Sequence, residues 1–138
     1  MSKLARTGIS LEEELLARFD RVIRRAGYRN RSEAIRDLVR DYTVLEDVEK
    51  DRTVVGTLTM VYDHHRPGLA ARLIEAQHHA AAKVLAATHV HLDPSNCLEV
   101  VIMKGRSSEV NHIAERILSL RGVKHGKVVL TTTGKGLD

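Results

Sequence analysis

The sequence predicts an α+β protein with two units, a small helical unit followed by one that mixes strands and helices. Apolar residues recur at helical spacing in two segments within roughly the first 45 residues. Beyond residue 54, strand-like and helical patterns follow one another in the order βαββαβ. A polar, acidic-rich stretch at residues 46–53 separates the two patterns, so we expect it to hold the end of a helix and a linker.

The first unit opens with residues 4–11, a mixed segment with strand character. A helix is expected next, with Ser10 as its N-cap and Glu13 completing a capping box. Gly27 follows the last apolar residue of this helix, where a C-cap glycine is favoured. The pattern therefore predicts a short strand, a helix and a tight turn.

A second helix is expected after that turn, with Asn30 as its N-cap and Glu33 three residues later. Its apolar stripe continues to Leu45, and we assign the whole unit to residues 1–48. So small a unit buries little surface, and a lone strand needs a neighbour. We expect a dimer in which two copies of the strand pair antiparallel.

The second unit is assigned to residues 54–138, after a linker at residues 49–53. Expected strands cover residues 54–62, 83–92, 97–104 and 123–133, and helices begin at Pro67 and at Ser107 or Ser108. This order is that of the ferredoxin-like split βαβ fold. The tail, residues 134–138, is expected to be loose.

Composition excludes several classes of protein. The net charge of +4 suits an anionic partner without requiring one. Aromatic residues make up only 3% of the chain, which argues against a stacking platform for single-stranded nucleic acid. No apolar run is long enough to span a membrane. The single cysteine, Cys97, excludes an intrachain disulfide, so we expect a cytoplasmic protein.

One group of side chains has the composition of a metal site. His89 and His91 alternate onto one face of a predicted strand, and a turn brings Cys97 close to His91. Nitrogen and sulfur donors suit zinc, copper and nickel. A fourth donor could be His78 or His79, from the same chain or a neighbouring one. The remaining histidines are interpreted as surface or hydrogen-bonded residues: His64, His65, His112 and His125.

A second group suits double-stranded DNA. In a paired ribbon, Arg6 and Ser10 would lie on one face, and such a ribbon fits the major groove. The start of the second helix, Asn30, Arg31 and Ser32, offers backbone N–H groups and a cation to a phosphate. The alternative is a helical dimerisation module with a solvated basic face.

Several segments together resemble the nickel-responsive transcriptional regulators, the NikR family. The resemblance rests on residues 28–37, 77–79, 88–91, 93–99 and 121–126, and it covers nearly the whole chain. It implies an N-terminal ribbon-helix-helix DNA-binding domain and a C-terminal ACT-like domain. It also implies a homotetramer, in which two ribbon-helix-helix dimers flank a tetrameric core.

The resemblance further implies a square-planar Ni(II) site made by His89, His91 and Cys97 of one chain and His78 of another. Such a site, shared between chains, would couple nickel binding to the arrangement of the DNA-binding dimers. Nickel would thereby promote binding to operator DNA and repress genes of nickel uptake.

Other residues acquire roles through the same resemblance. Gln77 and Glu99 would lie beside the metal ligands, and Glu99 alternates onto the face of Cys97. Glu33 and Asp37 suggest a further cation site near the domain junction. Gly8 departs from the family pattern, because relatives carry a hydroxyl residue at this base-reading position and glycine has no side chain to read a base.

Other functions remain open at this point. The same fold is compatible with a regulator that responds to another metal or to an amino acid. A small metalloenzyme would need an open coordination position and a general base, and no motif for the base is found. An antitoxin-like ribbon-helix-helix protein would not carry a βαββαβ domain.

Overall fold

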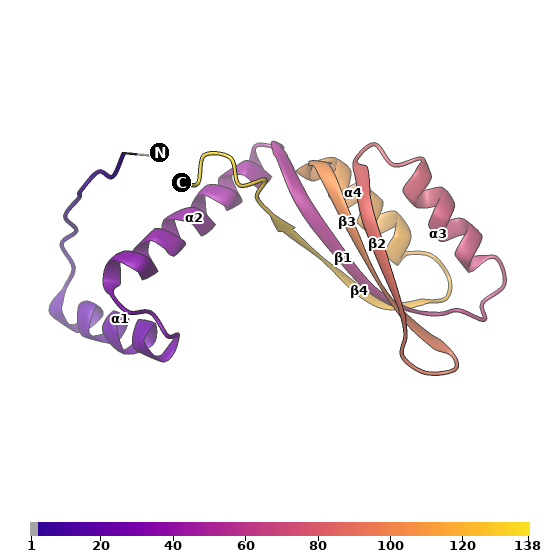
Figure 1. The fold of residues 1–138 in the computed structure, drawn as a ribbon, viewed down its shortest axis with the longest axis horizontal. Coiled ribbons are helices and arrows are strands. Elements are labelled where there is room, and N and C mark those ends of the chain that lie inside the picture. Colours follow the sequence, from indigo (N-terminus) through magenta and orange to yellow (C-terminus); the bar gives the residue numbers. More distant parts are fainter. Residues whose placement is uncertain (1–2) are drawn as a thin grey trace. The chain divides into compact units, whose positions relative to one another are not determined.

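The computed structural model of the chain describes residues 3–138, which form two compact units (Figure 1). One unit extends to Thr43 and includes the tail Gly134–Asp138, and the other is Val44–Thr133. None of the described helices combines the length and apolar character needed to cross a bilayer.

Two helices dominate the first unit, α1 (Glu13–Arg25) and α2 (Arg31–Glu49), and α2 continues into the second unit. The turn between them contains Gly27 at φ +87°, a left-handed conformation that favours glycine. The next amide, that of Tyr28, donates to the carbonyl of Ile23 at 3.0 Å, which closes the end of α1. The predicted C-cap glycine is therefore confirmed.

The two predicted N-caps have different outcomes. The side chain of Asn30 accepts a hydrogen bond from the Glu33 amide at 2.9 Å, as predicted. The Ser10 capping box is wrong, because α1 starts only at Glu13 and Glu12 occupies the N-cap position without a side-chain hydrogen bond. Instead, the carboxylates of Glu13 and Glu14 in the first turn stabilise the helix by their attraction to the positive end of its dipole.

The strand predicted at residues 4–11 is absent from the single chain, where residues 3–12 have no regular secondary structure. Its apolar side chains are exposed, Leu4 to 86% and Ile9 to 58%. A strand forms only when its backbone N–H and C=O groups pair with a neighbour, and no other described segment of this chain pairs with it.

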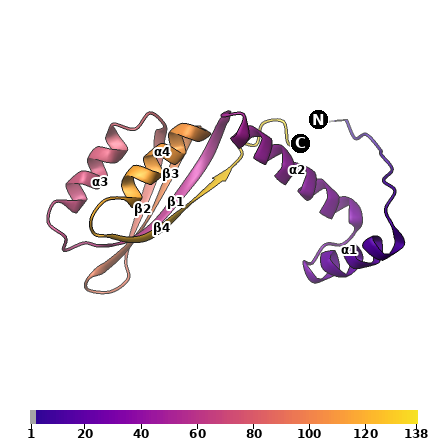
Figure 2. The ribbon, with the colours of Figure 1, turned by 180° about the vertical axis from the view of Figure 1, so that it is seen from behind.

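The second unit confirms the βαββαβ order. Its elements are β1 (Thr53–Asp63), α3 (Leu69–His78), β2 (Lys83–His91), β3 (Asn96–Arg106), α4 (Ser107–Leu118) and β4 (Val123–Thr131). The antiparallel sheet has the strand order β2-β3-β1-β4, which places β2 and β4 at its edges. Both helices cover one face of this sheet (Figures 1 and 2). This is the ferredoxin-like topology that the sequence predicts.

Strand alternation builds the core of this unit. Every second residue of β1 and β3 is buried beneath the helices, including Val54, Leu58, Met60, Tyr62, Cys97, Val101 and Met103. Gly56 allows α4 to approach closely, since a Cβ there would lie 2.5 Å from a methyl carbon of Val110. The edge strand β2 differs, because nearly all its side chains are exposed, including Leu85 and Val90.

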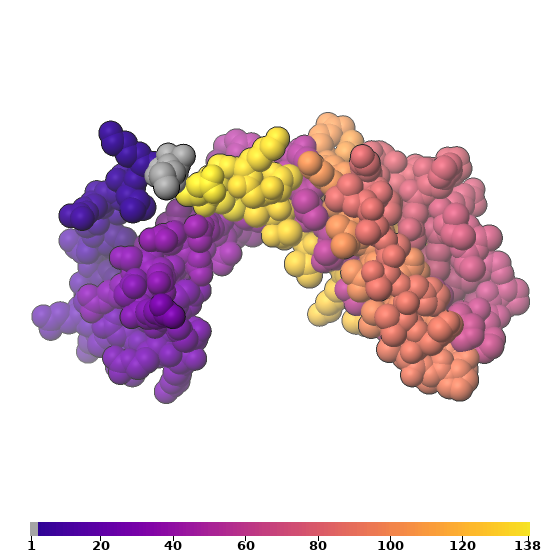
Figure 3. Space-filling view, in the orientation of Figure 1, coloured from indigo at the N-terminus to yellow at the C-terminus, as the bar shows by residue number. Residues whose placement is uncertain are grey.

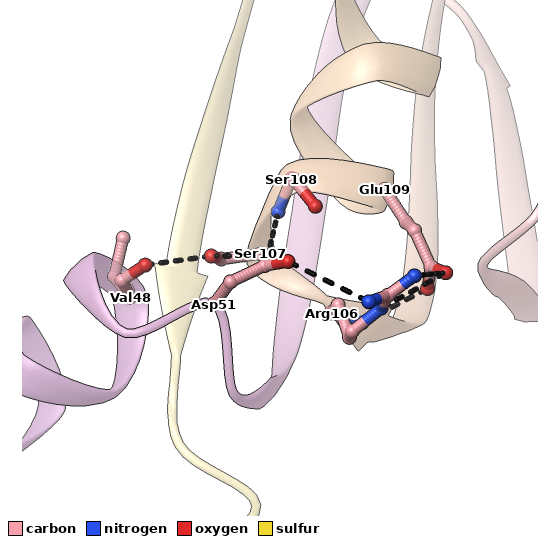
Figure 4. Close-up of polar contacts among 6 residues, drawn as sticks. All are labelled: Val48, Asp51, Arg106, Ser107, Ser108 and Glu109. Carbon is pink, nitrogen blue, oxygen red and sulfur yellow. Dashed lines mark hydrogen bonds and ion pairs between the residues drawn. The ribbon is translucent and has the colours of Figure 1, made fainter.

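The segment expected to be a linker, residues 49–53, makes specific contacts (Figure 4). The amide of Ser108 donates to the carboxylate of Asp51 at 2.8 Å, and the Ser107 hydroxyl donates to the carbonyl of Val48 at 2.7 Å. Asp51 has φ +52° and caps the start of α4 from outside that helix. The end of α2 is thereby fixed to the second unit.

The tail is ordered by contacts with the first unit rather than loose. Arg40 on α2 donates to the carbonyl of Leu137 at 3.1 Å, and the tail lies against this helix (Figure 3). The same guanidinium donates to the carboxylate of Asp37 at 3.2 Å. The charged Arg40 side chain therefore holds the backbone of the tail. The sequence pattern gives no indication of this contact.

Replacing Asp51 with alanine is expected to lower the thermal unfolding midpoint of the metal-free protein by roughly 2–5 °C, because α4 loses its cap. Asp51→Asn should restore most of the loss, since an amide oxygen also accepts and asparagine tolerates positive φ. Glu115→Ala, an exposed carboxylate on the same helix, is the control. Equal midpoints for Asp51→Ala and the native chain would remove this role.

Acid should abolish the advantage of aspartate over asparagine at this position. Hydrogen bonds from Ser108 hold the pKa of Asp51 below its usual value. The resulting stability is present above the ordinary aspartate pKa and is lost as the pH falls through the lowered pKa. Unfolding midpoints measured across this acidic range should therefore converge for the native chain and Asp51→Asn.

Candidate metal centre and nucleic-acid interface

The predicted hairpin between β2 and β3 forms and sets the register of the metal residues. His91 lies opposite Cys97, and His89 lies opposite Glu99. The connecting turn is closed by Asp93, whose carboxylate accepts from the amide of Asn96 at 2.8 Å. Such side-chain turns are the reason that aspartate is frequent in this setting.

Cys97 is fully buried and lies next to two imidazoles. Its Sγ is 3.2 Å from Nδ1 of His91 and 3.4 Å from Nδ1 of His64. The three donor atoms all lie within 4.8 Å of one another, the spacing that one metal ion requires. Among the described residues, His64, His91 and Cys97 are the potential ligands that lie close enough together to hold one metal ion.

His64 was not a predicted ligand. It follows β1, and its amide donates to the carbonyl of Ser95 in the β2–β3 turn at 3.1 Å. Its position depends on the pairing of β1 with β3, which sets Asp63 opposite Asn96. The only sequence signal was a histidine two residues after the strand predicted at residues 54–62. This signal points to the cluster only once the pairing of β1 with β3 is known.

His89 lies beside His91, with ring centroids 5.1 Å apart, but it is outside the three-donor cluster. Its Nδ1 is 3.2 Å from the hydroxyl of Tyr62. Burial raises the pKa of Tyr62, with a further contribution from the charge of Glu99. The phenol therefore remains protonated, and its hydrogen bond with Nδ1 orients the His89 ring.

His78 ends α3, where its ring lies 5.5 Å from that of His79, and it also stays outside the cluster within one chain. The neighbouring Gln77 donates to the buried carboxylate of Glu99 at 3.3 Å. This bond connects the end of α3 to the residue opposite His89. The roles of Gln77 and Glu99 beside the metal ligands stay predictions, and the structure adds the hydrogen bond that joins the two side chains.

Burial raises the pKa of the Cys97 thiol, and the nearby carboxylates of Asp93, Glu99 and Asp63 raise it further. The free thiol is therefore protonated at neutral pH, and a metal must displace that proton. A thiolate with imidazoles suits nickel, zinc or copper rather than magnesium or calcium. The donor set fits the predicted nickel ion.

The predicted DNA-binding residues lie in the first unit, and one of them is already paired. Arg31 donates twice to the carboxylate of Asp20, both at 2.8 Å, which raises the pKa of Arg31 and lowers that of Asp20. Arg6, Ser10 and Ser32 line one open hollow of about 880 Å³. Arg31 therefore contributes to the contact of α1 with α2, which sequence analysis did not foresee.

At the suggested second cation site, Glu33 and Asp37, the Asp37 carboxylate already accepts hydrogen bonds from other side chains. The carboxylate of Asp37 accepts from the hydroxyl of Tyr28 at 2.9 Å and from Arg40. Glu33 lies one turn earlier on α2, with its backbone amide bonded to Asn30. Neither carboxylate belongs to a three-ligand cluster in the part of the chain that the structure describes.

Comparison with protein families assigns both units. Residues 55–131 match the NikR C-terminal nickel-binding domain, and residues 5–46 match the ribbon-helix-helix proteins of the copG family. Among solved structures, the ACT domain of a GTP pyrophosphokinase from Chlorobium tepidum aligns with a TM-score of 0.48 and 8% identity. That alignment covers 56% of this chain and 99% of that chain.

Full-length relatives carry the name nickel-responsive regulator. A protein of Thermococcus onnurineus (strain NA1) is 51% identical over 98% of this chain and 99% of its own length. One of Geobacter sp. (strain M21) is 49% identical over 99% of each chain. These matches exclude the enzyme interpretation and support Ni(II) as the bound ion. The chain belongs to the family of nickel-responsive regulators, with a ribbon-helix-helix DNA-binding domain and a NikR nickel-binding domain.

Proposed function

We propose that this protein is a nickel-dependent repressor that binds operator DNA when nickel is present and so limits nickel uptake. The observation that carries the proposal is the buried Cys97 thiol, aligned by strand register with His91 in a domain of the nickel-binding family. A repressor of this kind acts where the chromosome lies, which agrees with the expected cytoplasmic setting.

The proposed nickel ligands are His89, His91 and Cys97 of one chain and His78 of a second chain. Two features support a shared site. His78 is exposed and outside the intrachain cluster, so it is available to another copy. The edge strand β2 is exposed along almost its whole length, with Val90 46% exposed between the two histidines. A homotetramer built from two dimers would cover these surfaces.

The proposed DNA surface also needs a second copy. Pairing of residues 4–11 between chains would bury Ile9, now 58% exposed, and place Arg6 and Ser10 on the outer face of a ribbon. The start of α2, with Asn30 and Ser32, would present backbone N–H groups to a phosphate. We assign Arg31 a supporting role there, because Asp20 engages one edge of its guanidinium through Nε and Nη2.

Bound nickel would supply bonds that join two chains. Residues of this chain orient the ligand side chains and connect them to the surrounding helices and strands. Tyr62 orients the His89 ring, and the Gln77–Glu99 hydrogen bond connects α3 to β3. The Asp51 carboxylate caps α4 and lies directly after the end of α2, within the unit that holds the metal ligands. Linkage then requires operator DNA to strengthen nickel binding by the factor by which nickel strengthens DNA binding.

Cys97→Ala is expected to abolish nickel-dependent operator binding and the nickel–thiolate absorbance, because the sulfur ligand is lost. The fold should persist, since alanine is tolerated at a small buried position. Purified protein would be titrated with operator DNA with and without stoichiometric Ni(II), and circular dichroism would monitor the fold. His112→Ala, on the exposed face of α4, is the control. Full nickel-dependent binding by Cys97→Ala would refute the proposed site.

Nickel affinity should weaken as the pH falls. Because burial raises the pKa of Cys97, each bound ion displaces a thiol proton, and affinity should drop about tenfold per pH unit below that pKa. Competition with a chelator of known pH dependence measures the slope. A flat profile across neutral pH would exclude thiolate coordination.

Arg6→Ala should weaken operator binding by roughly tenfold or more, the effect of one lost bidentate base contact, and leave nickel affinity unchanged. Arg6→Lys keeps the charge and separates base reading from phosphate attraction. Fluorescence anisotropy on operator and scrambled duplexes, each at two salt concentrations, distinguishes the two effects. Unchanged operator affinity in both variants would remove Arg6 from DNA recognition.

A further inference from the structure

We propose that the end of the tail, residues 136–138, is an autoinhibitory segment that lowers the affinity of the first unit for DNA. This inhibitory segment places a carboxylate among cations beside the ribbon segment, residues 4–11, and the phosphates of a duplex must displace it. The competing partner is the DNA backbone, whatever its sequence. The proposal rests on the proposed function in one respect, the use of the ribbon segment as the DNA surface.

One hollow of the first unit brings the inhibitory segment, helix α2 and the start of the ribbon segment together. Its volume is about 380 Å³, and its lining includes Lys3, Leu4, Arg36, Arg40, Leu137 and Asp138. Arg36 and Arg40 are four residues apart on α2, so their side chains lie on the same face of the helix. Asp138 supplies the acidic side chain of a lining that holds three cations.

Two of these cations border the proposed DNA surface. Arg36 also lines the larger hollow that contains Arg6 and Ser10, and Lys3 lies directly before the ribbon segment. Both side chains are exposed, and neither forms an ion pair with another residue in the range 3–138. Cations in this state attract duplex phosphates, which supply most of the sequence-independent affinity for DNA. A carboxylate in the same hollow lowers the local positive potential and so weakens that attraction.

The contacts that hold the inhibitory segment are few and solvent-accessible. The Nε of Arg40 donates to the carbonyl of Leu137 at 3.1 Å, and the Arg40 side chain stays 41% exposed. Leu137 is partly buried, whereas Gly136 and Asp138 on either side of it are exposed. Exposed polar contacts contribute little to stability. The segment can therefore leave α2 when duplex phosphates approach the same cations.

Gly136 gives the inhibitory segment its backbone conformation. Its φ is +77°, in the left-handed region that favours glycine, and a Cβ added there would meet nothing within 4 Å. An alanine would therefore fit the available space but disfavour the observed backbone. Gly136→Ala should loosen the segment while every side chain that it carries remains, which makes this variant independent of the charge of Asp138.

The test compares Asp138→Asn and Gly136→Ala with the native chain. Glu115→Gln is the matched control, because it removes one exposed negative charge from α4, outside the first unit. Fluorescence anisotropy measures the binding of the full chain to a scrambled duplex at several salt concentrations, with and without stoichiometric Ni(II). Operator duplex is titrated in parallel, and circular dichroism monitors the fold of each variant.

Both variants of the inhibitory segment should bind the scrambled duplex about two- to fivefold more tightly, the factor that one exposed ion pair supplies. Asp138→Asn should also steepen the dependence of log affinity on log salt by about one, since one more cation can neutralise a phosphate. Glu115→Gln should change neither quantity. Unchanged or weaker duplex binding in either variant would overturn the proposal. An equal gain in Glu115→Gln would do the same, because net charge alone would then explain the effect.

The outcome separates this proposal from the proposed function. The inhibitory segment is tested on a scrambled duplex, whereas the proposed function is tested by the nickel dependence of operator binding in the native chain. Tighter duplex binding by both variants, in a protein whose operator affinity ignores nickel, would support autoinhibition and refute the nickel-dependent repressor. Nickel-dependent operator binding with unchanged duplex affinity in both variants would refute autoinhibition alone.

Discussion

The antiparallel pairing of β3 with both of its neighbours is the constraint on which the rest of the structure depends. Cys97 lies opposite Tyr62 on one side and His91 on the other, so one strand register sets the surroundings of the thiol. Because side chains alternate along a strand, a slip of one residue would turn the sulfur away from both neighbours. The buried cores of β1 and β3 oppose such a slip, since it would expose every apolar side chain beneath the helices.

Much of the chain is built to meet another copy. The segment at residues 3–12 leaves apolar side chains exposed, and the edge strand β2 does the same on the other unit. Exposed strand edges are a hazard for a monomer, and proteins usually cover them. Both proposed activities, DNA binding and nickel binding, use these incomplete surfaces. In this proposal, association of chains completes the fold and creates the sites together.

Local sequence patterns predicted most elements correctly, and their failures have physical causes. The Asn30 cap, the Gly27 turn and the Asp93 turn are confirmed because each depends on hydrogen bonds within a few residues. The Ser10 cap is wrong because acidic residues let α1 start later without a side-chain cap. The tail is held by Arg40, 97 residues earlier in the chain, so no local pattern could indicate its order.

The sequence by itself determined the two-unit organisation, the βαββαβ order and the convergence of His91 with Cys97, because periodicity and short turns are local properties. Only the tertiary structure decided that His64 joins them and that Tyr62 holds His89. Both contacts require β1 to lie beside β3, a pairing between strands that are not consecutive. The partner of Arg31 lies on the preceding helix, 11 residues earlier, and the cap of α4 lies 57 residues earlier, so both depend on contacts between elements. Side chains that are distant in sequence come into contact because the strands pair in three dimensions, and their spacing along the chain does not indicate these contacts.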